Sequence, residues 1–174
     1  MTNPVTTGIT PLNNPFWQFS LKAYQDKKVR EACHLFQEKK GANVNLLLLC
    51  CWLAYAVEEI SKIEFTRACH SISSWHKEVT QTLREARRSL KQTQDNNWVH
   101  DFYKQILSDE ILSESYQQDC LFTHFENKQR ISPSKNEKQA GYYLGWLFND
   151  MQVVIDKTLD SRIQHFVTIV FSRI

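Results

Sequence analysis

The feature that most constrains this chain is an apolar run from Asn45 to Val57, which reads NLLLLCCWLAYAV. From Leu46 to Val57, twelve consecutive residues carry neither a charge nor a strongly polar side chain. A helix that is apolar on every side must be enclosed by protein or by lipid. Twelve helical residues span about 18 Å, well short of the roughly 30 Å hydrocarbon core of a bilayer. The run therefore predicts a buried central helix over about residues 45–60, and no membrane span.

The scarcity of glycine and proline favours helices throughout the chain. Between Phe16 and Arg130 there is no proline, and Gly41 is the only glycine. Both residue types punctuate sheets and loops, and no segment alternates as a strand does. A chain of 174 residues can bury a core as one domain. We expect an all-α fold, a single compact bundle of seven to nine helices over residues 15–174, after a flexible tail over residues 1–14.

Charge and cysteine usage indicate the compartment. Lys and Arg number 21 against 19 Asp and Glu, so no bulk attraction to nucleic acid or to an acidic membrane follows. The five cysteines are an odd number and lie mostly in apolar helical patterns, which suits buried thiols rather than disulfides. Residues 1–14 lack the basic and apolar segments of a secretory signal. We therefore predict a cytoplasmic protein.

Capping residues predict where the helices begin. Asn14 before Pro15 starts the first helix, and Asp26 starts a second that ends at Gly41. The central helix begins at Asn43 or Asn45, and Asn45 is interpreted as its N-cap rather than as a buried polar contact within a binding cleft. A further helical pattern runs from Ile63 to Ile72, and later helices are predicted to begin at Ser74, Trp98, Ser108, Ser134 and Asp160.

Several spaced blocks of sequence occur together over about residues 16–121. They are FWxFSLxxY from Phe16, VNLLL from Val44 with Trp52, LRxxRRxLK from Leu83, and Glu114 with Gln117 and Gln118. In this combination the chain resembles a family of small proteobacterial proteins built on a domain of unknown function. The resemblance implies a bacterial cytoplasmic origin and a compact helical domain, with no activity to carry over. The chain departs from the family pattern at Asn43, where an acidic residue is expected, and at His34, where leucine is expected.

Catalytic and metal-binding chemistry finds little support in the sequence. Cys33–His34, Cys69–His70 and His76 offer soft ligands, but neighbouring residues on a helix point about 100° apart and no paired zinc spacing occurs. Phosphate-binding glycine loops are absent, and the adjacent thiols of Cys50 and Cys51 lie in the most apolar segment. We predict no metal site, no cofactor and no catalytic residues.

The basic stripe Arg84, Arg87, Arg88 and Lys91 is the first candidate binding surface. Arg84, Arg88 and Lys91 follow steps of four and three, which places them on one helix face, where they could bind a partner or an anion. One alternative is a solvated face paired within the helix to Glu78 and Glu85. Another is a structural pair of Arg84 or Arg87 with Glu114 of a different helix.

Aromatic residues form the second candidate. Phe16 and Trp17 open the ordered chain and either pack over the central helix or anchor a partner. Trp52, Trp75 and His76 are candidates for lining one pocket beside the central helix.

These observations lead to one function hypothesis and two alternatives. We expect a small protein-binding factor with a regulatory or accessory role and a protein partner that the sequence does not identify. The first alternative is a small helical enzyme or ligand carrier with a pocket beside the central helix. The second is nucleic-acid binding through the basic face, which a larger basic excess would favour.

Overall fold

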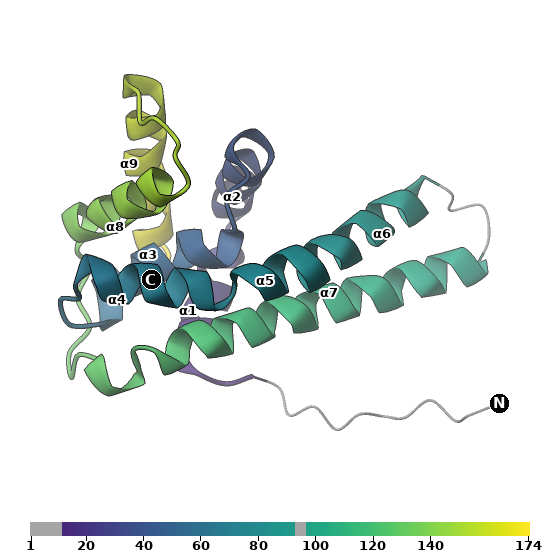
Figure 1. The fold of residues 1–174 in the computed structure, drawn as a ribbon, viewed down its shortest axis with the longest axis horizontal. Coiled ribbons are helices and arrows are strands. Elements are labelled where there is room, and N and C mark those ends of the chain that lie inside the picture. Colours follow the sequence, from purple (N-terminus) through teal and green to yellow (C-terminus); the bar gives the residue numbers. More distant parts are fainter. Residues whose placement is uncertain (1–11, 93–96) are drawn as a thin grey trace.

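Helices account for nearly all of the chain that the computed structural model describes, residues 12–92 and 97–174 (Figure 1). The expected all-α fold is confirmed, and the expected count of seven to nine helices is consistent with it. Within the described residues the only extended pairing is an isolated bridge between Val57 and Gln129. The elements are α1 Pro15–Tyr24, α2 Lys27–Lys40, α3 Val44–Ala56, α4 Lys62–Ser71, α5 Ser73–Trp75, the π-helical segment η1 His76–Thr80, α6 Gln81–Lys91, α7 Asn97–Thr123, the 3-10 turn η2 Glu126–Lys128, α8 Glu137–Asp150 and α9 Lys157–Phe171.

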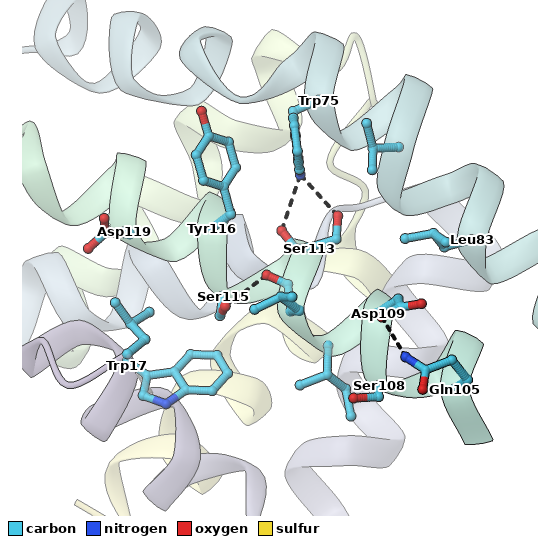
Figure 2. Close-up of a pocket in the computed structure, with 14 residues that line it drawn as sticks. Trp17, Trp75, Leu83, Gln105, Ser108, Asp109, Ser113, Ser115, Tyr116 and Asp119 are labelled. Carbon is cyan, nitrogen blue, oxygen red and sulfur yellow. Dashed lines mark hydrogen bonds between the residues drawn. The ribbon is translucent and has the colours of Figure 1, made fainter. Parts of the chain in front are cut away.

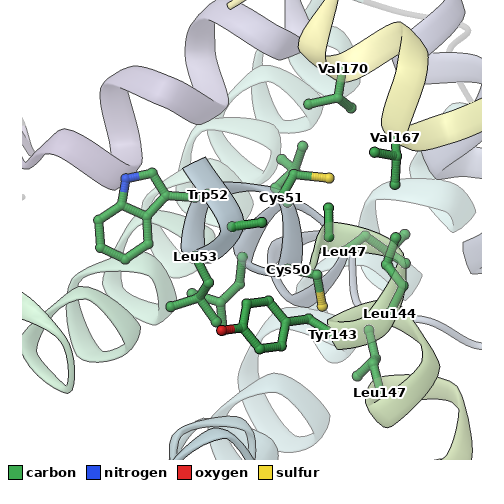
Figure 3. Packing of buried hydrophobic residues seen from close by; sticks show 14 of the residues in the cluster. Leu47, Cys50, Cys51, Trp52, Leu53, Tyr143, Leu144, Leu147, Val167 and Val170 are labelled. Atoms are coloured by element: carbon green, nitrogen blue, oxygen red, sulfur yellow. The ribbon is translucent and has the colours of Figure 1, made fainter. Parts of the chain in front are cut away.

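Helix α3 is the buried centre of the fold, as the apolar run predicts. Ten of its thirteen residues are buried. Leu144 and Leu147 of α8 and Val167 of α9 lie against it in Figure 3, which accounts for its lack of a polar face. The helix ends at Ala56, four residues before the predicted end. None of the helices in 12–92 and 97–174 combines the length and the apolar composition that a membrane crossing requires.

Local capping signals predict the first helices correctly. The side chain of Asn14 accepts a hydrogen bond from the backbone of Trp17, and that of Asp26 accepts one from Lys28. Gly41 ends α2 with a φ of 69°, the left-handed conformation that glycine adopts without strain. The reciprocal capping box between Ser61 and Glu64 at the start of α4 is not among the predicted helix starts. Of the predicted tail, residues 1–11 lie outside the described residues.

Other predicted helix starts are wrong. Asn43, not Asn45, caps α3; Asn136, not Ser134, caps α8; and Asp156, not Asp160, caps α9. The start predicted at Ser74 is also wrong, because α5 begins at Ser73 without a side-chain cap. Helix α7 continues through Ser108, which is exposed and does not begin a helix. A serine that faces solvent is tolerated inside a helix, so its presence alone does not mark a boundary.

Helix α6 and the first half of α7 form an antiparallel hairpin that projects from the rest of the fold (Figure 1). On the other side of the molecule, α8 and α9 cover α3. Segment η1 connects helix α6 of the hairpin to the rest of the fold. The second half of α7 continues beyond the hairpin and runs beneath α4 and α5 in the view of Figure 1. A π-helical turn is rare and is often found at functional sites. The junction between hairpin and body is where the candidate site lies.

Candidate functional site

An open groove of about 820 Å³ runs along α7 (Figure 2). On one side Trp75, Val79 and Leu83 come from α5, η1 and α6, and on the other Trp17 comes from α1. Helix α7 supplies the floor, with apolar side chains such as Leu112. Three separate segments of the chain therefore converge on one largely apolar surface.

The floor of the groove belongs to a longer row of side chains on α7, which we call the α7 stripe. Its members alternate in steps of four and three, the spacing that places residues on one helix face in coiled coils. Trp98 and Phe102 begin the stripe on the hairpin, are 73% and 42% exposed, and stack with ring centroids 5.4 Å apart. The stripe consists of Trp98, Phe102, Gln105, Asp109, Leu112, Tyr116 and Asp119.

Trp75 is held in the groove wall by hydrogen bonds that its indole N–H donates to Ser113, a buried residue. Its indole Nε1 donates to Ser113 Oγ at 3.0 Å, and its ring centroid lies 4.4 Å from that of Tyr116. Ser113 Oγ lies 2.6 Å from Thr80 Oγ1, which also accepts from Gln117 Nε2 at 2.7 Å. These bonds fix the indole orientation before any partner binds, and preorganisation lowers the entropic cost of binding.

The same chain of hydrogen bonds reaches the start of the central helix. Asn43 Nδ2 donates to Gln117 Oε1 at 2.8 Å, while Asn43 Oδ1 accepts from the backbone N–H of Asn45. Beside it, Gln118 Nε2 donates to Asn45 Oδ1 at 2.8 Å. Asn45 is therefore a buried polar contact and not the N-cap that the sequence predicts. Most buried amide groups in proteins are paired in this way.

Arginines and glutamates form a second buried cluster, between α6 and α7. Arg84 Nε donates to Glu110 at 2.9 Å, and Arg84 Nη2 donates to Glu114 at 2.7 Å. Arg87 also pairs with Glu110. Burial acts to raise the pKa of Glu110, but the hydrogen bonds and charges of Arg87 and Arg84 outweigh it, so the pKa is lowered. For Glu114 burial dominates and the pKa is raised.

Two of the four residues of the predicted basic stripe, Arg84 and Arg87, therefore pair with glutamates of α7 inside the fold. The expectation that Arg84 lies on an exposed face is wrong, because its side chain is only 11% exposed and pairs with two glutamates of α7. The predicted alternative, a pair between Arg84 and Glu114, is confirmed. Arg88 pairs with Glu38 of α2, and Lys91 is exposed at the end of α6. The hairpin places α7 carboxylates within ion-pair distance of Arg84 and Arg87, and no ion pair of the described residues involves Glu78 or Glu85.

The aromatic candidates separate into core and groove. Phe16 is fully buried against Trp52, with ring centroids 5.1 Å apart, so Phe16 does not form an exposed anchor. Trp17, one residue later on α1, lines the groove. Trp52 is a core residue that also packs on Phe122.

The predicted common pocket for Trp52, Trp75 and His76 is wrong. His76 lines a separate polar pocket of about 220 Å³, together with Arg84 and Arg88. Adjacent helical residues point about 100° apart, so Trp75 and His76 face different sides of their helix. Burial, together with the charge of Arg84, lowers the pKa of His76 to about 4.

The thiols and other potential ligands remain dispersed. All five cysteines are free, and burial raises the pKa of Cys33 and of Cys69 to about 12, which makes these thiols unreactive. Among the residues that the structure describes, no group of three His, Cys, Asp or Glu side chains could hold a metal ion.

Sequence reasoning missed the α7 stripe, including Asp109 and Asp119. The signal was present in the spacing of Trp98, Phe102, Leu112 and Tyr116. Dividing the segment into two helices at Ser108 broke the register that would have revealed it.

The chain belongs to a family of proteins of unknown function (DUF2390), whose family model matches residues 15–121. The predicted resemblance to a domain of unknown function is thereby confirmed. No curated protein and no solved structure matches the chain. The matched segment runs from α1 into the last turn of α7, so it contains every element of the groove and excludes α8 and α9.

Proposed function

We propose that this chain is a protein-binding accessory factor that docks a helix of its partner along the α7 stripe and its groove. The observation that carries the proposal is the α7 stripe, in which the exposed apolar residues Trp98, Phe102, Leu112 and Tyr116 lie on one helix face, with the polar residues Gln105 and Asp109 between the two pairs. Exposed apolar surface of this extent on a water-soluble helix marks an interaction site.

The spacing of the stripe suits a helical partner. Steps of four and three let a second helix pack along α7 with its own side chains between those of the stripe. From Trp98 to Asp119 the stripe is about 32 Å long, the length of a helix of about twenty residues. Trp17 and Trp75 flank the inner end, and buried aromatic residues dominate the energetics of many interfaces. Docking of an amphipathic helix in an apolar groove is a common recognition mode.

The other two hypotheses have less support. A ligand carrier or enzyme needs an enclosed pocket of about 300 Å³ or more with convergent polar groups. The groove along α7 exceeds that volume but is open, and the polar pocket at His76 measures about 220 Å³. Nucleic-acid binding needs available cations, but Arg84, Arg87 and Arg88 pair with carboxylates. Five free thiols support a reducing compartment such as the cytoplasm.

Site-directed photo-crosslinking tests the proposal. Leu112 in the groove is replaced by p-benzoylphenylalanine, and Tyr142 on α8, another exposed apolar position, receives the same amino acid as a matched control. After irradiation in an extract of the source organism, position 112 should crosslink to a defined partner, and the attached peptide should belong to a helical segment. Adding Trp98→Ser and Phe102→Ser should weaken this crosslinking at least tenfold. The same products from positions 112 and 142, or no product from 112, would refute the proposal.

A further inference from the structure

We infer that the partner helix is cationic and places Lys or Arg side chains opposite Asp109 and Asp119; this inference rests on the proposed function. Fourteen described residues line the groove, and the two charged ones, Asp109 and Asp119, are both acidic. No lysine, arginine or histidine is among those fourteen. The apolar surface is therefore combined with charge of a single sign.

Neither carboxylate takes part in an ion pair of the described residues. Asp109 accepts a hydrogen bond from Gln105 Nε2 at 3.0 Å, one turn earlier on the same helix. Asp119 accepts one from Asn14 Nδ2 at 3.2 Å. Both donors are neutral amides, so no cation of the described residues pairs with either carboxylate.

Docking of an apolar helix would remove water from these two carboxylates. An ionised carboxylate loses its hydration at a large cost unless a cation replaces the water. A neutral or acidic helix would leave that cost in place, whereas a Lys or Arg at each end would offset it. The charges of the groove therefore discriminate between partner helices that share the same apolar pattern.

The geometry also fixes the spacing of the partner's cations. Asp109 and Asp119 lie ten residues apart on one face of α7, a separation of about 15 Å along the helix. On a partner helix packed alongside, two residues of one face at that separation are ten or eleven positions apart. Between them, apolar residues in steps of three and four would meet Leu112 and Tyr116.

The charges of Asp109 and Asp119 disfavour two other occupants of the groove, a second copy of α7 and residues 1–11 of the same chain. Two copies of the α7 stripe, paired in parallel or about the centre of the stripe in antiparallel, would bring the two Asp109 residues together. Residues 1–11, which precede Leu12 at the groove, carry no charged side chain and so offer no side-chain cation. A separate basic amphipathic helix complements the groove better than either.

A helical peptide library distinguishes these possibilities. Peptides of about twenty-one residues, randomised at the positions that would face α7, are selected on the immobilised full chain. The selected peptides should carry Lys or Arg at two positions ten or eleven apart, and should bind about tenfold more tightly than versions with Gln there. The preference should weaken with rising salt. It should disappear on an Asp109→Asn, Asp119→Asn double variant, while Asp101→Asn, on α7 outside the stripe, serves as the matched control.

The outcomes separate the two proposals. Selected peptides with apolar steps but no preference for cations would overturn the inference and leave helix docking intact. Failure to select peptides that bind the wild-type chain better than a Trp98→Ser, Tyr116→Ser variant would overturn both. A concentration-dependent dimer that Tyr116→Ser dissociates would replace the partner helix by a second copy, and would likewise overturn the inference.

Discussion

Glu110 should stabilise the hairpin more than any exposed ion pair of this chain can. It lies on the inner face of α7, its side chain is 6% exposed, and it accepts hydrogen bonds from both Arg84 and Arg87. Substituting Glu110→Gln keeps the shape but removes the charge and replaces one acceptor oxygen by an N–H₂ donor. That donor would face a guanidinium, which has only donors.

The expected magnitude follows from burial. Removing one partner of a buried ion pair costs about 3–5 kcal/mol, because the other charge stays buried without compensation. Arg84 keeps Glu114 as a second partner, so we expect about 3 kcal/mol, the lower end of that range. The matched control is Glu38→Gln, which disrupts the pair with Arg88, whose side chains are 51% and 42% exposed. An exposed pair contributes about 0–1 kcal/mol.

Urea unfolding followed by far-UV circular dichroism measures both losses, because the described fold is nearly all helical. A double variant, Arg84→Gln with Glu110→Gln, should lose less than the sum of the two single losses, by about 1–3 kcal/mol, since the two charges compensate each other. Equal losses from Glu110→Gln and Glu38→Gln, or strictly additive losses in the double variant, would refute the reasoning that burial determines the strength of this cluster.

Three further predictions concern other parts of the fold, each measured by urea unfolding. The pKa of His76 is about 4 in the folded chain and 6.5 in the unfolded chain, so between these two pH values the unfolded chain binds one more proton. The free energy of unfolding should therefore fall from pH 6.5 towards pH 4, by about 3 kcal/mol at most. The variant His76→Gln should flatten that decline. Gly41→Ala should lose about 1 kcal/mol because φ is positive there, whereas Gly145→Ala, inside α8 with open space at its Cβ, should be neutral or stabilising. Asn43→Ala should lose about 1–3 kcal/mol through its cap and its bond to Gln117, and Asn43→Asp less than 1 kcal/mol.

Structural features that depend only on residues close together in the sequence, such as the burial of α3 and several helix caps, could be predicted from the sequence. The composition of one segment determines that α3 must be enclosed, and Asn14, Asp26 and Gly41 act on the backbone within a few residues of themselves. The false starts at Ser108 and Ser134 have the same local origin, because a polar side chain suits a solvent-facing position as well as a cap. Element type is therefore more predictable than element boundary.

The candidate site depends on contacts across the sequence, which spacing does not reveal. Whether Arg84 faces solvent or Glu110 depends on how α6 and α7 are aligned in the hairpin. The sequence left the pairing of Arg84 with Glu114 open as one alternative, and gave no reason to select Glu110. Likewise, Trp17 and Trp75 share the groove only because α1 and α5 lie on either side of α7.

The buried hydrogen-bond chain from Asn43 to Trp75 would let an acidic residue, the type that the family resemblance predicts at position 43, replace Asn43 without moving the groove. An acidic residue at position 43 could still cap α3, but it could only accept from Gln117, so the amide of Gln117 would have to turn over. Its oxygen would then face Thr80, whose hydroxyl can donate as readily as accept. The hydroxyl of Ser113 would still accept from the Trp75 indole. The hydroxyls of Thr80 and Ser113 can each either donate or accept a hydrogen bond. The hydrogen bonds along this chain of side chains can therefore reverse their direction while the Trp75 indole keeps its place in the groove wall.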